Sequence, residues 1–183
     1  AEIKCASPSR GIIRRNVDMA MMAGVLEQGG CSAISVLTEP CFFGGSGQDI
    51  ERVKTAVGLP VLRKDFIIDD RQIAESRALG ADAVLLIAAV LKGNLADFVD
   101  SAIGYGLEPL VEVHTADEAE VARATEATLI GINNRNLETL AIDRSTTRVL
   151  SERIRGDNRL IVSESGMRSA DDVREMKQYC DAF

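Results

Sequence analysis

The stretch Pro60–Ala88, PVLRKDFIIDDRQIAESRALGADAVLLIA, decides the fold. It begins with a short apolar run at Pro60–Arg63 and continues with a segment of helical periodicity at Asp70–Leu79. A second apolar run, Ala83–Ala88, follows Gly80, a residue type that commonly ends helices. Continuous apolar runs of this length are typical of strands that are buried on both faces of a parallel sheet. This stretch therefore predicts a β-α-β unit.

The same alternation extends over the whole chain. The predicted strands are Glu2–Lys4, Ala33–Leu37, Pro60–Arg63, Ala83–Ala88, Pro109–His114, Leu129–Asn133 and Leu160–Ser163. The predicted helices are Val17–Gln28, Asp49–Ala56, Asp70–Leu79, Leu91–Tyr105, Ala116–Ala124, Ser145–Glu152 and Ala170–Tyr179, with Thr115, Ser145 and Ser169 placed to cap helix starts. Seven β-α units followed by Asp181–Phe183 predict an α/β fold, an incomplete (β/α)8 TIM barrel that enters its eighth strand. The structural alternative is an open, doubly wound sheet of seven parallel strands.

Composition restricts the class of protein. The 183 residues are 46% hydrophobic and contain no Trp, which suits a single domain over residues 1–183 with an aliphatic core. A net charge of -7 without a Lys/Arg-rich run disfavours a nucleic-acid partner, and no apolar run reaches the roughly 18 residues of a membrane span. Four cysteines without a CxxC pair are expected to be reduced and mostly buried, and a single histidine argues against a zinc site.

Charged residues close several of the predicted strands, where β/α barrels build their active sites. Glu2 and Lys4 lie two residues apart and so share one face of a strand, Lys64 follows the third strand, and Glu112 lies in the fifth. Because an unpaired buried ion costs several kcal/mol, these groups, joined by Glu164 at the end of the seventh strand, are expected to neutralise one another, with pKa values shifted toward acid–base work. The alternative is that they are exposed polar residues at the start of loops.

Other polar segments admit two interpretations. The loop Ala6–Gly11 and the pair Ser165–Gly166 suit an anion or are plain turns. The loop Phe42–Gly47 is either a mobile lid or a packed loop. Cys5 has the opposite parity to the charged pair and is expected in the core, while His114 is a candidate to support Glu112 or a solvated capping residue.

Seven motifs in order resemble those of the indole-3-glycerol phosphate synthase family. They are EIKCASPS at 2–9, ISVLTE at 34–39, LRKDFII at 62–68, GADAVLLI at 80–87, EVH at 112–114, GINNRNL at 131–137 and SESG at 163–166. They cover essentially the whole chain, and the KDF and INNR segments are characteristic of this synthase among phosphate-binding barrels.

The resemblance implies a cytoplasmic carboxy-lyase of tryptophan biosynthesis that works without a cofactor. Its substrate is 1-(2-carboxyphenylamino)-1-deoxyribulose 5-phosphate, which closes to indole-3-glycerol phosphate with loss of carbon dioxide and water. Lys64 matches the general acid of the family. Glu112 matches the carboxylate that acts as base or stabilises the iminium charge, and Lys4, with Glu2 beside it, matches a lysine that contacts substrate and serves in dehydration. The resemblance leaves open which group carries each proton.

The same resemblance implies the substrate contacts. Ser7 and Gly166 correspond to phosphate-site positions, and Phe66 and Leu85 to apolar walls around the aromatic ring. Four further residues correspond to polar substrate contacts, namely Asn133, Arg135, Glu164 and Ser165. Lys4, Lys64 and Arg135 are expected to make the mouth of the site locally positive.

Relative to the family, the chain is expected to be truncated at both ends, lacking an N-terminal helical extension and the last β-α unit. Open barrel edges are an invitation to self-association. Two alternatives therefore remain. One is a non-catalytic barrel fragment that acts as an assembly unit. The other is a different phosphate-binding barrel enzyme, an isomerase or a Schiff-base aldolase that uses Lys64.

Overall fold

The computed structural model describes residues 1–156 and 158–183, which form two compact units. The first unit contains Ala1–Leu85 and Ser101–Glu108, and the second contains Leu86–Asp100 and Pro109–Phe183. Strand β6 (Ala83–Ile87) is divided between them. The prediction of one domain over residues 1–183 stays a prediction.

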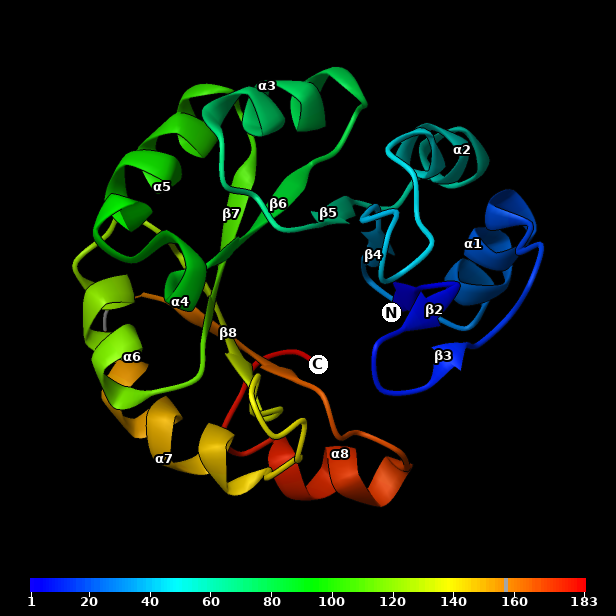
Figure 1. Ribbon diagram of the computed structural model, residues 1–183. Helices are drawn as coiled ribbons and strands as arrows, with labels where there is room; N and C mark the ends of the chain where they lie inside the picture. Colours follow the sequence, from blue (N-terminus) through cyan, green and yellow to red (C-terminus); the bar gives the residue numbers. More distant parts are fainter. Residues whose placement is uncertain (157) are drawn as a thin grey trace. The chain divides into compact units, whose positions relative to one another are not determined.

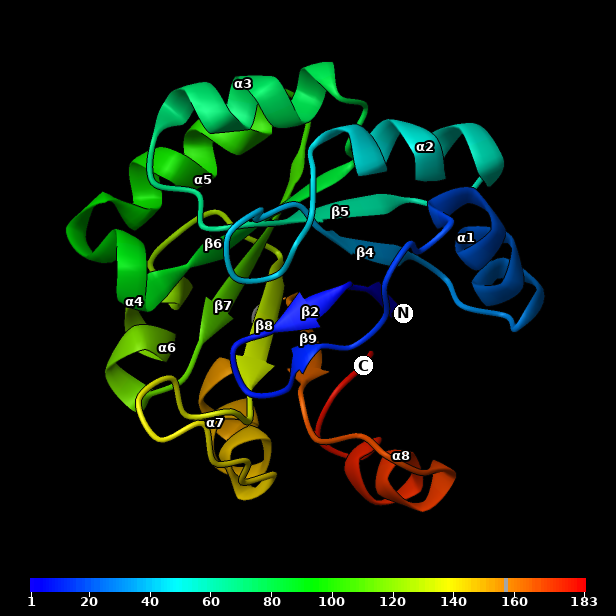
Figure 2. The same cartoon turned by 45° about the vertical axis from the view of Figure 1, so that its right-hand side comes forward.

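The first unit is built on parallel strands in the order β1–β4–β5–β6. These strands are β1 (Glu2–Ile3), β4 (Ile34–Leu37) and β5 (Val61–Lys64), followed by β6. Its helices are α1 (Met19–Gln28), α2 (Gln48–Ala56) and α3 (Asp70–Ala78). Helices α1 and α2 lie side by side, and α2 packs along β5 (Figure 2). Ile34, Val36 and Val61 are completely buried in this core.

The second unit contains parallel strands in the order β7–β8–β9. Its strands are β7 (Glu108–Val113), β8 (Leu129–Asn133) and β9 (Leu160–Glu164). Its helices are α4 (Ala88–Leu91), α6 (Ala116–Arg123), α7 (Ser145–Ile154) and α8 (Ala170–Met176), while α5 (Leu95–Gly104) is divided between the units. Helices α6 and α7 lie side by side, and α7 packs on β8 (Figure 1). The start of an eighth strand is present, because Ala182 forms a parallel bridge with Val162 of β9.

The seven predicted strands are confirmed, each within a residue or two of its predicted bounds. The predicted helix over 91–105 is wrong at its start. The chain turns into α4 directly after β6, a 3-10 turn follows at Lys92–Asn94, and α5 begins only at Leu95. Lys92 interrupts the helix with a φ of +50°, a change of direction that apolar periodicity does not register.

The helix caps follow the side-chain chemistry of the first turn. The hydroxyls of Thr115 and Ser169 accept backbone N–H bonds at the starts of α6 and α8, as predicted. Ser145 is not a cap, because it is the first residue of α7 and its own N–H is bonded by the carboxylate of Asp143. Sequence reasoning also missed a small antiparallel hairpin made of β2 (Ala6–Ser7) and β3 (Gly11–Ile12), visible in Figure 1.

The four cysteines are free thiols, as predicted, but only Cys180 is buried. The expectation that Cys5 lies in the core is wrong, and the residue is half-buried. Strand β1 ends at Ile3, so the alternation of faces does not extend to Cys5, whose carbonyl instead accepts the N–H groups of Ile13 and Arg14. No helix of the described residues is long and apolar enough to cross a membrane.

Two neighbouring residues of β9 test the assigned core. Ile161 is fully buried and Leu160 is 56% exposed. Ile161→Ala is expected to lower the free energy of unfolding by about 2–5 kcal/mol, because it leaves a cavity, whereas Leu160→Ala changes it by less than about 0.5 kcal/mol. Urea denaturation of both variants measures the difference. Equal effects would contradict the assigned orientation of β9.

Candidate active site

In the first unit, one carboxylate joins two lysines. Lys4 Nζ donates to Glu2 Oε1, and Lys64 Nζ lies 3.1 Å from Glu2 Oε2. Strand β1 pairs with β4, and β4 pairs with β5, which brings the ends of β1 and β5 to the same edge of the sheet. Burial disfavours the charged carboxylate, but Lys64 and Lys4 outweigh this and hold the pKa of Glu2 below its usual value of 4.5. The expected neutralising cluster is therefore present for these three residues.

Apolar side chains adjoin Lys64. Leu62 and Arg63 pair with Ala83 and Val84 of β6, and continuing this register sets Lys64 beside Leu85, which is 2% exposed. Phe66 follows β5 and is 43% exposed, with its ring tilted by 50° against Phe43 at a centroid distance of 6.4 Å. Sequence reasoning singled out Phe66 and treated Phe43 only as part of a loop. The adjacent aromatic residues Phe42 and Phe43 were the sequence signal that could have identified Phe43.

The Phe42–Gly47 loop is packed, which favours the prediction of a packed loop over that of a mobile lid. The buried carboxylate of Glu39 accepts the backbone N–H groups of Cys41, Phe42 and Phe43. Gly45 passes so close to β4 that a Cβ there would lie 2.1 Å from the carbonyl oxygen of Leu37. The loop is thus tied to the strand that precedes it.

A buried arginine supports the strand that carries Lys64. Arg63 is 5% exposed and lies on the opposite face of β5. Its guanidinium bonds Thr38 Oγ1 at 3.2 Å, Asp65 Oδ2 at 3.1 Å and Glu75 Oε2 at 2.7 Å. These bonds connect β5 to the end of β4 and to α3. Sequence reasoning did not use Arg63, although a charged residue next to a candidate catalytic lysine was an available signal.

Ser7 lies on the β2–β3 hairpin. Its side chain is almost buried, and its hydroxyl is 3.5 Å from that of Ser9. The Ser7 carbonyl accepts the N–H of Arg10, which closes the hairpin. The segment is therefore an ordered turn whose two hydroxyls lie together, and its suitability for an anion stays a prediction.

In the second unit, a histidine lies between two carboxylates. His114 Nε2 is 3.3 Å from Glu112 Oε1, and Nδ1 is 3.3 Å from Glu118 Oε2. The backbone N–H of His114 also donates to Glu118 Oε2 at 2.7 Å. Glu112 is only 2% exposed. Burial lowers the pKa of His114, but hydrogen bonds and attraction from Glu112 and Glu118 dominate and raise it from 6.5 to about 9. The ring is therefore an imidazolium at neutral pH.

The ends of β8 and β9 bring further polar groups into this unit. Asn133 pairs in register with Glu164, and Gly131 pairs with Glu112. A Cβ at Gly131 would lie 2.1 Å from Glu164 Oε1, so the missing side chain leaves the space that the Glu164 carboxylate occupies. Asn133 Oδ1 accepts the N–H of Arg135 at 3.0 Å. The arrangement sets the Glu164 carboxylate against the strand position that adjoins Glu112.

A buried asparagine that sequence reasoning did not select joins these strand ends to α7. Asn134 Nδ2 donates to Ser163 Oγ and to the carbonyl oxygens of Glu164 and Ser165, at 3.0–3.1 Å. Its Oδ1 accepts the N–H and hydroxyl of Thr147. The consecutive asparagines of the INNR segment were the signal, because a strand alternates its faces and only one of the two can face the site.

Arg135, Ser165 and Gly166 lie in the loops that follow. Arg135 Nη1 donates to the carbonyl of Leu140 at 3.0 Å, so its guanidinium is held by its own loop. Ser165 and Gly166 both have left-handed backbones, with φ of +65° and +92°. A Cβ at Gly166 would also lie 2.8 Å from Ile142 Cγ2, which explains glycine at this position. Among the described residues, no group of three or more histidine, cysteine and carboxylate side chains is arranged to hold a metal ion.

Comparison with known proteins identifies the family. A family model described as indole-3-glycerol phosphate synthase matches residues 1–183. The chain belongs to the indole-3-glycerol phosphate synthase family. It is 51% identical over 172 residues to the synthase of Caldanaerobacter subterraneus subsp. tengcongensis, and 48% identical over 177 residues to that of Azospirillum brasilense. The matches cover 94% and 96% of this chain and 67% of each relative, so the chain spans about two thirds of their length. The predicted family is therefore confirmed, and with it a carboxy-lyase function in tryptophan biosynthesis.

Solved structures confirm the fold class. An N-acetylmannosamine-6-phosphate 2-epimerase from Clostridium perfringens matches 99% of this chain and 82% of its own, with a TM-score of 0.71 at 14% identity. A 3-hexulose-6-phosphate synthase matches 90% of this chain with a TM-score of 0.70 at 17% identity. At these identities the similarity concerns the fold alone, and it supports the predicted β/α barrel over the doubly wound sheet.

The histidine between two carboxylates predicts a specific dependence of stability on pH. Between pH 6.5 and about 9 the folded state binds a proton at His114 that the unfolded state has lost. The free energy of unfolding therefore falls as the pH rises through this interval, by at most about 1.4 kcal/mol per pH unit. In His114→Gln this component is absent. Urea midpoints of both proteins across the interval measure it, and parallel curves would contradict the assigned charge of His114.

Proposed function

We propose that this chain catalyses the reaction of its family. The reaction closes the ring of 1-(2-carboxyphenylamino)-1-deoxyribulose 5-phosphate to give indole-3-glycerol phosphate, with loss of carbon dioxide and water. The observation that carries the proposal is the Glu2 carboxylate between Lys4 and Lys64, at the ends of two parallel strands, β1 and β5, that flank β4. Ring closure requires an acid at the ketone oxygen while the new carbon–carbon bond forms, and an ammonium group at this position supplies one.

Lys64 is the general acid in this proposal, and Lys4 contacts the substrate and serves in dehydration. Glu2 limits where both ammonium groups can move, because each of its two oxygens contacts one lysine. The buried Arg63 on the other face of β5 fixes the strand beneath Lys64. A positioned acid needs this kind of support, since small misplacements of a catalytic group reduce rates strongly.

Glu112 provides the negative charge that the reaction needs as nitrogen becomes an iminium. Its side chain is buried, so its field acts in a medium of low dielectric constant. Asn133, Glu164 and Ser165 contribute polar contacts in the same unit. Phe66 and Leu85 form apolar walls for the aromatic ring, and Ser7, Arg135 and Gly166 contribute to binding the phosphate and carboxylate groups of the substrate.

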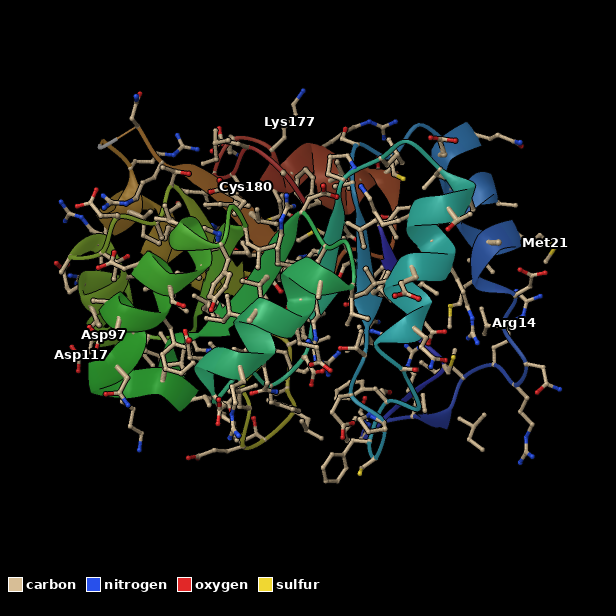
Figure 3. The ribbon with its side chains drawn as sticks, turned by 90° about the horizontal axis from the view of Figure 1, so that it is seen from above. Arg14, Met21, Asp97, Asp117, Lys177 and Cys180 are labelled. Atoms are coloured by element: carbon tan, nitrogen blue, oxygen red, sulfur yellow. The ribbon has the colours of Figure 1, made fainter. Side chains whose placement is uncertain are left out.

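Lys64→Ala is expected to abolish formation of indole-3-glycerol phosphate, with a loss of at least about a hundredfold in kcat, because it removes the proton donor. Fluorescence of the indole product measures the reaction directly, since the chain contains no Trp. Lys177→Ala is the matched control, because Lys177 is exposed after α8 and its side chain projects away from the ribbon (Figure 3).

Three outcomes separate this proposal from its alternatives. Product from the wild type and from Lys177→Ala, but not from Lys64→Ala, supports the synthase. Equal rates in all three proteins would contradict the role of Lys64. Trapping of Lys64 by borohydride with a sugar phosphate would favour a Schiff-base aldolase, because only an imine can be reduced to a stable adduct.

The proposed setting is the cytoplasm, with a small phosphorylated molecule as substrate and neither nucleic acid nor membrane as partner. Four free thiols, one of them exposed at Cys41, support a reducing compartment. The net charge of -7 disfavours a polyanionic partner. We also propose that residues 1–183 act as a single domain.

Helix α1 supports the proposal that a second copy of the chain binds the first unit. Met21 and Val25 lie one turn apart on α1, are 56% and 57% exposed, and Met21 points outward in Figure 3. Strand β1 also stands at one end of the strand order. Exposed apolar pairs and strand edges are common sites of association.

The double variant Met21→Glu/Val25→Glu is expected to remove self-association, because charged side chains cannot be buried unpaired against a second copy. Sedimentation velocity over a range of concentrations measures the change from the dimer to the 19.7 kDa monomer. Leu160→Ala, which removes an exposed apolar side chain elsewhere, serves as the control. A wild type that stays monomeric at every concentration would contradict this proposal.

A further inference from the structure

The buried carboxylate of Glu112 requires a positive partner. It is 2% exposed, and an uncompensated buried ion costs several kcal/mol or becomes protonated. His114, two residues along the same strand face, places Nε2 at 3.3 Å from Glu112 Oε1. The side chain of His114 is itself only 10% exposed, so water screens this contact little.

The other edge of the imidazole ring is held by Glu118. Glu118 Oε2 lies 3.3 Å from Nδ1 and accepts the His114 backbone N–H at 2.7 Å, which fixes the carboxylate relative to both ring and main chain. Nε2 makes no hydrogen bond to any residue that the structure describes, so its contact with Glu112 is one of charge, whereas Nδ1 is within hydrogen-bond distance of Glu118. A carboxylate at each edge of the ring favours the form with both nitrogens protonated. The carboxylates that face the ring are therefore Glu112 of β7 and Glu118 of α6.

We propose that His114 is a positioning residue for the synthase reaction. As an imidazolium it fixes the orientation of Glu112 and keeps this carboxylate ionised, and Glu118 anchors the ring in the required position. This inference rests on the role given to Glu112 in the proposed function. It extends that function to two residues, His114 and Glu118, that do not touch the substrate and act through Glu112.

A purely structural role for the triad is the competing explanation. The start of α6 is already capped by the hydroxyl of Thr115, which accepts the N–H of Glu118. The Glu118 carboxylate is instead turned toward His114, and the Nε2 side of the ring is directed to the buried Glu112. Capping α6 requires neither the Glu118–His114 contact nor the His114–Glu112 contact. Holding the Glu112 carboxylate in one orientation requires both.

The charge on the ring is testable without catalysis, because His114 is the sole histidine of the chain and its NMR signals are unambiguous. The wild-type imidazole is expected to titrate near pH 9. Glu112→Gln and Glu118→Gln should each move the midpoint toward the ordinary 6.5. Glu120→Gln is the matched control, since this half-exposed residue of α6 pairs with arginines. A wild-type midpoint near 6.5, or one that Glu112→Gln leaves unchanged, would overturn the proposal.

Kinetics distinguish positioning from a structural role. His114→Gln keeps a hydrogen-bond donor near Glu112 but removes the positive charge. It is expected to lower kcat about ten- to hundredfold, because the buried Glu112 carboxylate loses the positive charge that faces it, with KM changed less than about twofold. The fall of wild-type kcat toward pH 9 should disappear in this variant. Unchanged kcat and an unchanged pH profile, in a variant that is folded by circular dichroism, would overturn the proposal.

The titration of His114 and the kinetics of His114→Gln together separate this inference from the proposed function. A wild-type chain that forms no indole product contradicts the proposed function, and the titration of His114 then decides by itself whether the ring holds Glu112 ionised. A wild-type chain that forms product, together with a fully active His114→Gln, contradicts the inference and leaves the proposed function intact.

Discussion

Charged groups at the strand ends lie against counter-charges within their own unit, and this constraint is strongest where a side chain has little access to water, as for Glu112 and His114. In the first unit the two lysines share the carboxylate of Glu2, and in the second unit the imidazolium of His114 lies between Glu112 and Glu118. These contacts hold the pKa of Glu2 below its usual value and that of His114 above it. The same kind of interaction therefore neutralises charge at the strand ends of each unit.

Close backbone approach is the second constraint, and it explains particular glycines. Gly45 allows a loop to pass against β4, and Gly131 leaves room for the carboxylate of Glu164. Within its own unit, each of Arg63 and Asn134 bonds strand ends to the loops and helices nearby. These bonds restrain the strand ends that carry the candidate residues.

Strand positions were predictable because each strand is a continuous apolar run that must be buried on both faces. The polar residues at the strand ends were also predictable, since they interrupt that pattern. The break between α4 and α5 was not, because a single residue with positive φ at Lys92 leaves the apolar periodicity intact. The cap of α7 was predicted at Ser145, whereas the Asp143 carboxylate accepts the backbone N–H at the start of this helix. Both residue types are good caps, so the sequence alone does not choose between them.

The sequence by itself determined the family, the order of the β-α units and the residues at the strand ends, because these follow from local pattern and from motifs in a set order. Only the tertiary structure decided which of these groups meet. The contact of Glu2 with two lysines, the position of His114 between two carboxylates and the space beside Gly131 all depend on register between strands. Register is a property of paired strands, and no single segment of the chain contains it.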